Sequence, residues 1–223
     1  KMLEEIKKTA AFIRSATGDF APEVGIVLGT GLGDFADRIE TCHALDYKDI
    51  PGFPVSTVEG HKGRLIFGEA GGRRVVAMQG RFHYYEGYTM QQVTFPVRVL
   101  KQLGIRCLFV SNASGGINRS FRTGDLMIIT DHINLMPNPL IGPTFETQAE
   151  YRYFKAIGGD AAGMSTVPEV IVARHMSLPV FGVSVITNCG LSDEIGDHED
   201  VQRQGKKAGV KMARLFMELL KEV

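Results

Sequence analysis

Residues that could bind an anion and a sugar gather in one stretch of the chain, Met78 to Tyr88, with the sequence MQGRFHYYEGY. The stretch follows a short apolar run, Val75 to Ala77, whose β-branched residues favour a buried strand, and Gly80 allows a sharp turn. Arginine offers a planar fork of donors, histidine a titratable ring and tyrosine a flat face with a hydroxyl. The cluster is either an anion and sugar site at a strand end or a set of surface aromatics that caps the strand. Its side chains are Arg81, His83, Tyr84, Tyr85, Glu86 and Tyr88.

A glycine-rich loop after the apolar strand at Val24, within VGIVLGTGLG, is a second candidate for phosphate binding. Its G-x-G-x-G spacing differs from the dinucleotide fingerprint, which needs a glycine where Asp34 stands, and the lysine of a P-loop is absent. Backbone N–H groups and the hydroxyl of Thr30 could still bind a phosphate. The alternative is a plain tight turn.

A third segment of small residues follows the apolar strand predicted at Arg106 to Val110. This segment, SNASGGIN from Ser111 to Asn118, is predicted to be a loop that approaches a ligand closely, with Asn112 both donating and accepting hydrogen bonds. Strands that end in glycine-containing loops, with helices between them, indicate an α/β sheet. Its ligand is expected beyond the carboxyl ends of the strands.

The rest of the sequence predicts the helices and strands that must position these segments. Apolar periodicity predicts helices over residues 2–17, 89–103 and 199–223, a helix starting at Thr144, and another after the polar turn of GMSTVPEV. Further β-structure is predicted over residues 55–79, 126–130 and 179–187, the last ending on Asn188. His61 lies in a predicted turn and matters only if the fold carries it to the loops above. His132 is predicted to be a packed, structural side chain, and residues 136–143 a proline-rich loop.

Length and composition favour one domain over residues 1–223. The chain is 44% hydrophobic and 22% charged, and its 25 basic and 25 acidic residues give no net charge, so no general attraction to nucleic acid or an anionic membrane is expected. No apolar run approaches the roughly 18 residues of a membrane span, and a cytoplasmic protein is expected. The three cysteines are too few and scattered for a disulfide framework or a zinc site. Buried free thiols are therefore expected at Cys42, Cys107 and Cys189.

Taken together and in this order, the segments resemble the trimeric class of purine nucleoside phosphorylases. The matching segments cover nearly the whole chain, and MQGRFHYYEGY together with MSTVPEV is very specific. The resemblance implies one α/β domain with a central mixed, partly barrel-like sheet flanked by helices, and a homotrimer. It also implies reversible attack of inorganic phosphate on C1′ of a purine nucleoside, with phosphate as a co-substrate and no cofactor or metal.

The resemblance also implies a phosphate site. Phosphate would both stabilise and attack an oxocarbenium-like centre, so the enzyme would supply donors and no nucleophile of its own. Glu86 would orient His83, and both are assigned to catalysis. The implied phosphate-binding residues are Thr30, His61, Arg81, His83, Asn112, Ala113 through its backbone N–H, and Ser165.

The nucleoside would contact a separate set of residues. By the resemblance, Asn188 donates toward N7 of the leaving purine and Glu146 accepts from N1–H, a pair that implies 6-oxopurines. Tyr84 and Tyr88 are expected only to pack. The implied nucleoside-binding residues are Tyr85 and Met164 at the ribose, His198 at its 5′-hydroxyl, and Phe145, Glu146 and Asn188.

Two departures from the family pattern bear on this interpretation. Thr30 stands where serine is common, and its hydroxyl is kept. Between Pro143 and Thr144 the family carries several tens of additional residues, which are either deleted here or a mobile segment missing from this chain; the second is favoured because long active-site loops are often mobile. Residues 190–197 are a further candidate lid.

Two other functions remain open. The first is phosphorolysis of methylthioadenosine, although relatives with that activity are expected to carry an aspartate in place of Asn188. The second is a catalytically silent nucleoside-binding protein, which the missing stretch after Pro143 would favour.

Overall fold

The computed structural model describes residues 2–58, 61–136, 142, 144–191 and 198–223. Among them are five α-helices: α1 (Met2–Ala16), α2 (Met90–Leu103), α3 (Gln148–Ala156), α4 (Thr166–His175) and α5 (His198–Glu222). Short 3-10 turns lie at η1 (Gly33–Arg38), η2 (Tyr47–Asp49) and η3 (Tyr84–Glu86). The described strands are β1 (Val24–Leu28), β2 (Glu40–Asp46), β3 (Arg64–Ala70), β4 (Arg73–Gln79), β5 (Cys107–Gly116), β6 (Leu126–Ile128), β7 (Ala161–Ala162) and β8 (Val180–Cys189).

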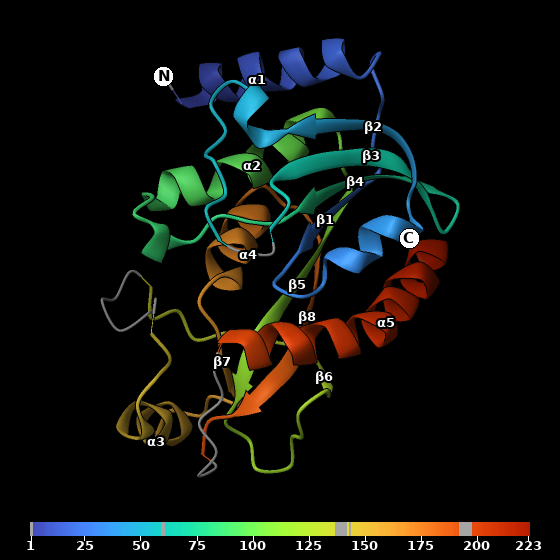
Figure 1. Ribbon diagram of the computed structural model, residues 1–223. Helices are drawn as coiled ribbons and strands as arrows, with labels where there is room; N and C mark the ends of the chain where they lie inside the picture. The colour runs from blue at the N-terminus through green and yellow to red at the C-terminus, as the bar shows by residue number, and fades with distance from the viewer. Residues whose placement is uncertain (1, 59–60, 137–141, 143, 192–197) are drawn as a thin grey trace.

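The strands form one mixed sheet in the order β2-β3-β4-β1-β5-β8-β6, and β7 pairs with β5 (Figure 1). The four central strands β4, β1, β5 and β8 are parallel neighbours, whereas β2, β3, β6 and β7 are joined by antiparallel pairing. Parallel strands carry their carboxyl ends to the same edge. The expected α/β fold with a central mixed sheet is confirmed.

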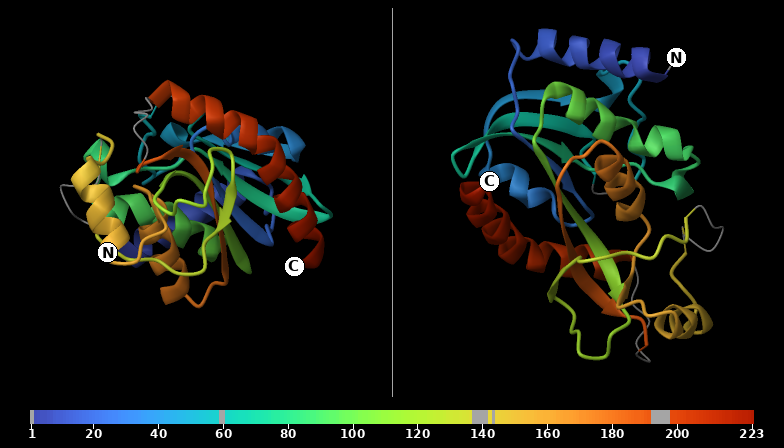
Figure 2. Two further views of the ribbon diagram at one scale, coloured as in Figure 1. Left: turned by 90° about the horizontal axis from the view of Figure 1, so that it is seen from below. Right: turned by 180° about the vertical axis from the view of Figure 1, so that it is seen from behind.

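Helices cover both faces of this sheet, and alternate residues of each strand face opposite sides. In β1, Val27 packs with α1, α2 and α4, while Ile26 and Leu28 pack with η1 and α5. Figure 2 shows α5 on the side of the sheet opposite α2 and α4. Central strands that are apolar on both faces thus yield two hydrophobic cores, one on each face.

Local capping sets the starts of two helices. Thr89 caps α2 with Gln92 in a reciprocal capping box, and the helix runs unbroken through Pro96 to Gly104, where φ is +111°. Thr147 forms the same box with Glu150 at α3. The prediction of a helix from Thr144 was therefore wrong in its start, because the cap begins the helix at Gln148.

The strands at the functional edge are longer than the sequence predicts. Residues 111–116, expected as a loop, continue β5 because β8 pairs with them in parallel and β7 pairs with Gly115 and Gly116. Likewise Asn188 lies inside β8 and does not follow it. Conversely, residues 54–58 and 61–63 are not strand; Tyr88 holds this segment by donating to the carbonyl of Val55 at 2.6 Å.

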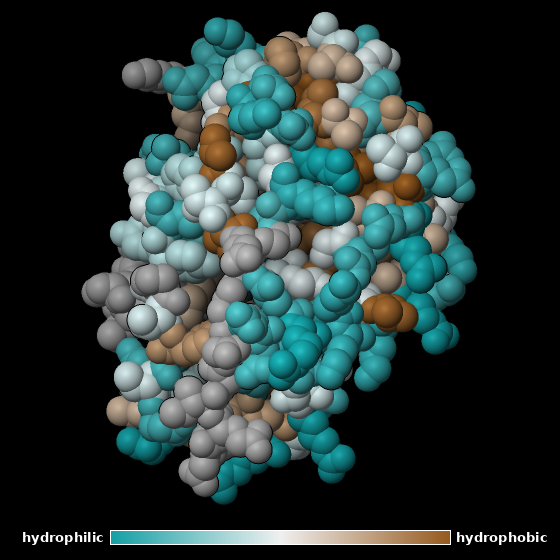
Figure 3. Space-filling view, viewed as in Figure 1, coloured by the Kyte–Doolittle hydropathy of each residue, from teal (hydrophilic) through white to brown (hydrophobic). Residues whose placement is uncertain are grey.

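The surface around α5 is mainly hydrophilic, and the cysteines are less buried than the sequence predicts. On the face shown in Figure 3, hydrophilic side chains cover most of the region around α5, and apolar side chains lie in scattered places. All three cysteines are free, but Cys42 is exposed and Cys107 and Cys189 are only half-buried, so the prediction of burial was wrong. None of the described helices has the length and apolar character needed to cross a membrane.

The packing of α5 predicts a large loss of stability on truncation of Phe216. This ring is fully buried and lies 5.4–6.2 Å, between ring centroids, from Phe35, Phe109 and Phe181. Phe216→Ala should lower the free energy of unfolding by about 3–5 kcal/mol, measured by urea denaturation. Val210→Ala, at a position 59% exposed on the same helix, is the control and should change it little. Equal effects of the two substitutions would contradict this packing.

Candidate active site

The parallel strands bring the predicted phosphate segments together. Leu28 pairs with Gln79 and Val27 with Val110, so the segments that follow β1 and β4 lie beside the outer half of β5. Gly29 lies so close to β5 that a Cβ there would be 2.7 Å from the carbonyl oxygen of Ser111. A side chain at this position would push the loop away, which is a physical reason for glycine in the LGTG turn.

Arg81 is almost fully buried, with 1% of its surface exposed. Its Nε and Nη2 donate to the two carboxylate oxygens of Glu169 at 3.0 and 2.7 Å, and Nη1 donates to the carbonyl of Ser111 at 2.6 Å. The predicted phosphate ligand thus uses three of its N–H groups to hold the fold together. Glu169, which lies in the first turn of α4, was not predicted as part of the site.

His83 is held by Glu86, as the resemblance implies. The carboxylate oxygen Oε1 of Glu86 lies 2.8 Å from His83 Nδ1 and 2.7 Å from its backbone nitrogen, while Oε2 accepts from Thr57. Burial by itself raises the pKa of Glu86, but the hydrogen bonds from His83 and Thr57 outweigh it and lower this pKa to about 2. An ionised carboxylate only accepts, so Nδ1 carries the proton and Nε2 is left for a ligand.

His61 lies beside this pair, although it comes from a distant turn. Its ring stacks on His83 at 5.5 Å, and His83 stacks on Tyr85 at 4.7 Å. Burial, reinforced by the charges of His83 and Arg81, lowers the pKa of His61 to about 4, so the ring is neutral at pH 7. Nδ1 lies 3.3 Å from both the backbone nitrogen and the carbonyl oxygen of Arg81, and within the described residues the buried Nε2 has no partner. The tautomer that accepts at Nδ1 leaves Nε2–H free to donate to an anion.

His61, Arg81 and His83 are called the anion cluster below. The start of α4 lies on the other side of this cluster. Ser165 is buried, and its side chain does not cap the helix. The amide of Asn112 donates to Thr166 Oγ1 at 2.6 Å and accepts from Ser114 Oγ at 2.6 Å. Both ends of the amide are therefore engaged within the protein, which fixes β5, and hence Ala113, against the N-terminus of α4. Free N–H groups of a helix N-terminus favour an anion.

The predicted ribose residues lie at a second point of convergence. A Cβ at Gly142 would be 2.8 Å from both Tyr85 and Met164, so these two side chains flank the same backbone. Phe145 is 41% exposed. The side chain of His198 and residues 192–197 of the predicted lid lie outside the described part of the chain, as does Pro143 at the predicted gap.

Glu146 and Asn188, predicted to read the base, are joined by a residue that was not predicted. The hydroxyl of Tyr151 donates to Glu146 Oε2 at 3.0 Å and accepts from Asn188 Nδ2 at 3.4 Å. Burial raises the pKa of Glu146, and its hydrogen bonds with its own backbone N–H and with Tyr151 partly offset this. Tyr151 lies within the segment TFETQAEYR, but no local signal in the sequence marked it for this contact.

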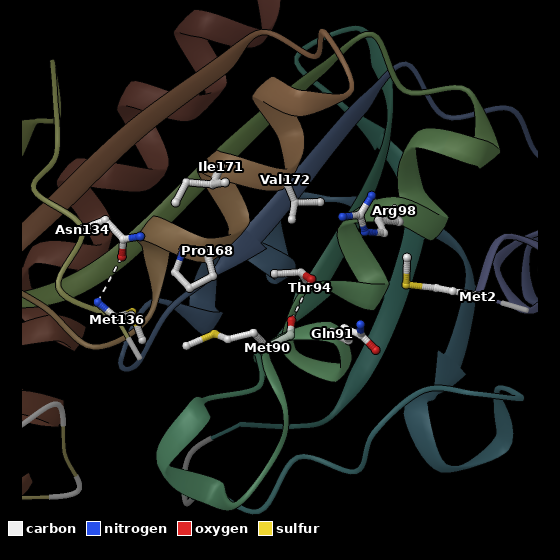
Figure 4. A pocket seen from close by; sticks show the side chains of 10 residues that line it. All are labelled: Met2, Met90, Gln91, Thr94, Arg98, Asn134, Met136, Pro168, Ile171 and Val172. Carbon is white, nitrogen blue, oxygen red and sulfur yellow. Dashed lines mark hydrogen bonds between the residues drawn. The ribbon is translucent and has the colours of Figure 1, made fainter. Parts of the chain in front are cut away.

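A cavity of about 840 Å³ is lined in part by Glu146, Asn112 and Thr166, whereas Asn188, His61, Arg81 and His83 do not line it. His132 also lines it and is exposed, so its prediction as a packed residue was wrong. A smaller, mainly apolar cavity of about 290 Å³ lies between α2 and α4, and the predicted substrate residues do not line it (Figure 4). Within the described ranges, no three His, Cys, Asp or Glu side chains are grouped closely enough to hold a metal ion.

The hydrogen bonds to Glu86 predict a pH-dependent contribution to stability. Because its pKa is depressed in the folded state, from an ordinary value of 4.5 to about 2, Glu86 stabilises the fold above pH 4.5. This stabilisation is lost as the pH falls from 4.5 toward 2. The free energy of unfolding of Glu86→Gln, measured in urea, should be lower than that of the wild type at pH 7, and the difference should shrink toward pH 3. Glu69→Gln, on the exposed side of β3, is the control, and a difference that does not vary with pH would contradict the assignment.

Comparison with known proteins places the chain in a family. The model described as Phosphorylase superfamily matches residues 23–140 and 140–221. Purine nucleoside phosphorylase 1 of Bacillus subtilis (strain 168) is 44% identical over 271 positions that cover 100% of this chain and 98% of the relative. Because this chain has 223 residues, the relative carries residues without a counterpart here. The two stretches of the family match meet close to Pro143.

Solved structures agree with the sequence comparison. Purine nucleoside phosphorylase from Schistosoma, in complex with hypoxanthine, matches with a TM-score of 0.90 and 36% identity, over 99% of this chain and 97% of that one. The Schistosoma mansoni enzyme in complex with adenosine gives the same values. The fold, the order of the motifs and these matches together show that this chain belongs to the phosphorylase superfamily and, within it, to the purine nucleoside phosphorylases.

Proposed function

We propose that this protein catalyses the reversible phosphorolysis of 6-oxopurine nucleosides, inosine, guanosine and their 2′-deoxy forms, in purine salvage. The products are the free base and ribose or deoxyribose 1-phosphate. The observation that carries the proposal is a pair of side-chain groups: oriented anion donors at His61, Arg81 and His83, and a base-reading pair, Glu146 and Asn188, joined through Tyr151. Phosphate would bind at the first group and the purine base at the second.

The chemistry follows from the anion cluster. A phosphate oxygen forms a bond to C1′ as the bond from C1′ to N9 of the purine breaks, and the electron pair of that bond leaves with the base. His83 Nε2, His61 Nε2 and the hydroxyls of Thr30 and Ser165 donate to phosphate, together with the backbone N–H of Ala113. Glu86 holds the ring of His83 for this contact. Arg81, paired with Glu169, supplies its remaining N–H groups.

The base-reading pair stabilises the leaving group. Negative charge builds on the purine, and a donor near N7 lowers the barrier. Asn188 supplies that donor, and the carboxylate of Glu146 accepts N1–H of a 6-oxopurine. Adenine has no proton at N1, so Glu146 would face an acceptor and remain unpaired, which costs affinity.

Two other activities fit parts of the same site. Phosphorolysis of adenosine or methylthioadenosine gains support from the complex of a relative with adenosine. A nucleoside-binding protein without turnover gains support from the shorter chain, because the relatives carry additional residues. The anion cluster argues against this second alternative, since a protein that only binds nucleosides does not need it.

Several further properties belong to the same proposal. Inorganic phosphate is the co-substrate, and the reaction as written needs no cofactor. We expect a cytoplasmic homotrimer in which His198 contacts the 5′-hydroxyl, Tyr85 and Met164 the ribose, and Phe145 the nucleoside. We also expect the family residues between Pro143 and Thr144 to belong to the natural protein, with the whole chain forming one domain. The mass of the purified protein tests whether residues lie between Pro143 and Thr144, and light scattering tests the oligomeric state.

The direct test is release of hypoxanthine from inosine by the purified protein, with and without phosphate. Phosphate-dependent release is expected, and its rate should exceed that with methylthioadenosine. A clear preference for the adenine compound would support the first alternative. Calorimetric binding of inosine without turnover would support the second.

Asn188→Asp tests the base-reading pair. Replacing the amide donor with a carboxylate should lower kcat/KM for inosine by about a hundredfold, as does loss of one transition-state donor in other enzymes. It should also raise activity with adenosine, because a carboxylate accepts from the 6-amino group. Asn134→Asp, at an exposed asparagine that keeps its acceptor for the backbone of Met136, is the control. Unchanged selectivity in Asn188→Asp would remove Asn188 from the base site.

A further inference from the structure

Tyr151 lies between the two groups proposed to read the base, yet neither the motifs nor the proposed mechanism gives it a role. Its side chain projects from α3 and is 3% exposed. Its hydroxyl lies 3.0 Å from Glu146 Oε2 and 3.4 Å from Asn188 Nδ2. No direct hydrogen bond between Glu146 and Asn188 is found in the described structure, so the tyrosine hydroxyl is their shared partner.

The ring of Tyr151 fits closely against two glycines, where a side chain would leave no room for it. A Cβ at Gly190 would overlap the ring carbons of Tyr151, and a Cβ at Gly115 would lie 2.5 Å from its hydroxyl. Gly190 follows β8 and Gly115 lies in β5, so the slot is built from two neighbouring strands. Close packing on both sides leaves the ring little freedom to move, and the hydroxyl is therefore fixed relative to both strands.

The hydrogen bonds have a defined direction. Ionised Glu146 can only accept, so the single proton of the Tyr151 hydroxyl points to it. The hydroxyl oxygen is then an acceptor and must face an N–H, which places Nδ2 of Asn188 toward Tyr151. In this orientation Thr187 Oγ1, which lies 3.3 Å from Asn188 Oδ1, can donate to it. The second N–H of the same amide remains for the base.

We propose that Tyr151 is a specificity-determining positioning residue, whose hydroxyl couples an ionised Glu146 to a donating Asn188 so that the two read a 6-oxopurine as one unit. This inference rests on the proposed function and deepens it. The base itself contacts Glu146 and Asn188, and Tyr151 acts through them. If the two hydrogen bonds ran in the opposite direction, a protonated Glu146 would donate to Tyr151. The Tyr151 hydroxyl would then donate to Asn188, whose amide oxygen would turn toward it. The pattern presented to the base would then be the one that suits a 6-aminopurine.

The charges around Glu146 set the sign of a pH effect. Burial and the nearby Glu150 raise its pKa, while the hydrogen bond from Tyr151 lowers it, as does the backbone N–H of Glu146. Asn188 on β8 is uncharged and reaches Glu146 only through Tyr151. Removing the hydroxyl takes away a lowering contribution, so the pKa of Glu146 should rise. A reaction that requires ionised Glu146 then loses activity at a higher pH.

The test compares Tyr151→Phe with the wild type. The variant keeps the ring and its packing and loses only the hydroxyl. We expect kcat/KM for inosine to fall by about tenfold, the order expected for one hydrogen bond to a charged group. Activity with adenosine should be unchanged or higher, so the inosine to adenosine ratio falls. The acid limb of the inosine pH profile should move to higher pH.

Two controls separate positioning from general damage. Tyr153→Phe removes an exposed hydroxyl from the same helix and should leave the ratio and the pH profile unchanged. In a double-mutant cycle, Tyr151→Phe should have little effect on inosine once Asn188 is alanine, because the hydroxyl acts through that amide. A merely structural tyrosine would lower activity with both nucleosides equally and would add to Asn188→Ala.

Calorimetric binding of hypoxanthine and adenine distinguishes this inference from the proposed function. If the wild type releases no hypoxanthine from inosine but binds it in preference to adenine, and Tyr151→Phe loses that preference, the function fails and the inference stands. If the wild type is active and Tyr151→Phe leaves the ratio and the acid limb unchanged, the inference alone is overturned. Binding of neither base overturns both.

Discussion

A buried ion pair joins the end of β4 to the first turn of α4, between Arg81 and Glu169. Both side chains are almost fully excluded from water, and removing one partner of such a pair leaves an unpaired buried charge, which is far more costly than an exposed ion pair. The same guanidinium holds the carbonyl of Ser111 on β5. The start of α4 and the outer ends of two strands are therefore fixed to one another, and every predicted phosphate-binding residue except Thr30 and His61 lies on those segments or directly beside them.

The anion site and the base-reading pair meet different electrostatic requirements. At the anion site, neutral His61 and a pre-oriented His83 offer donors, and ionised Glu86 holds His83 through its Nδ1. At the base-reading pair, burial makes ionisation of Glu146 costly, and the Tyr151 hydroxyl offsets part of that cost. Parallel strands make this division possible because β1, β4, β5 and β8 all present their carboxyl ends at one edge.

Predictions from the sequence succeeded where the signal was local. Short apolar runs located the strands, and Gly104 marked the end of α2. They failed where partners distant in sequence decided the outcome. The small residues after Val110 read as a loop, but pairing with β8 continues them as strand. Tyr151 carried no signal in the sequence, because the slot that buries its ring is formed by Gly115 in β5 and Gly190 just after β8.

The sequence by itself determined the family, the α/β class and the residue types available for phosphate and base recognition, because motif spacing and apolar periodicity are properties of the chain. Only the tertiary structure decided which of those side chains are free for a ligand. Arg81 and Asn112 have most of their polar groups engaged within the protein, while His61, from a separate turn, keeps a buried nitrogen without a partner in the described structure. Burial and hydrogen-bond partners depend on contacts between distant segments, and such contacts exist only once the strands and helices have packed.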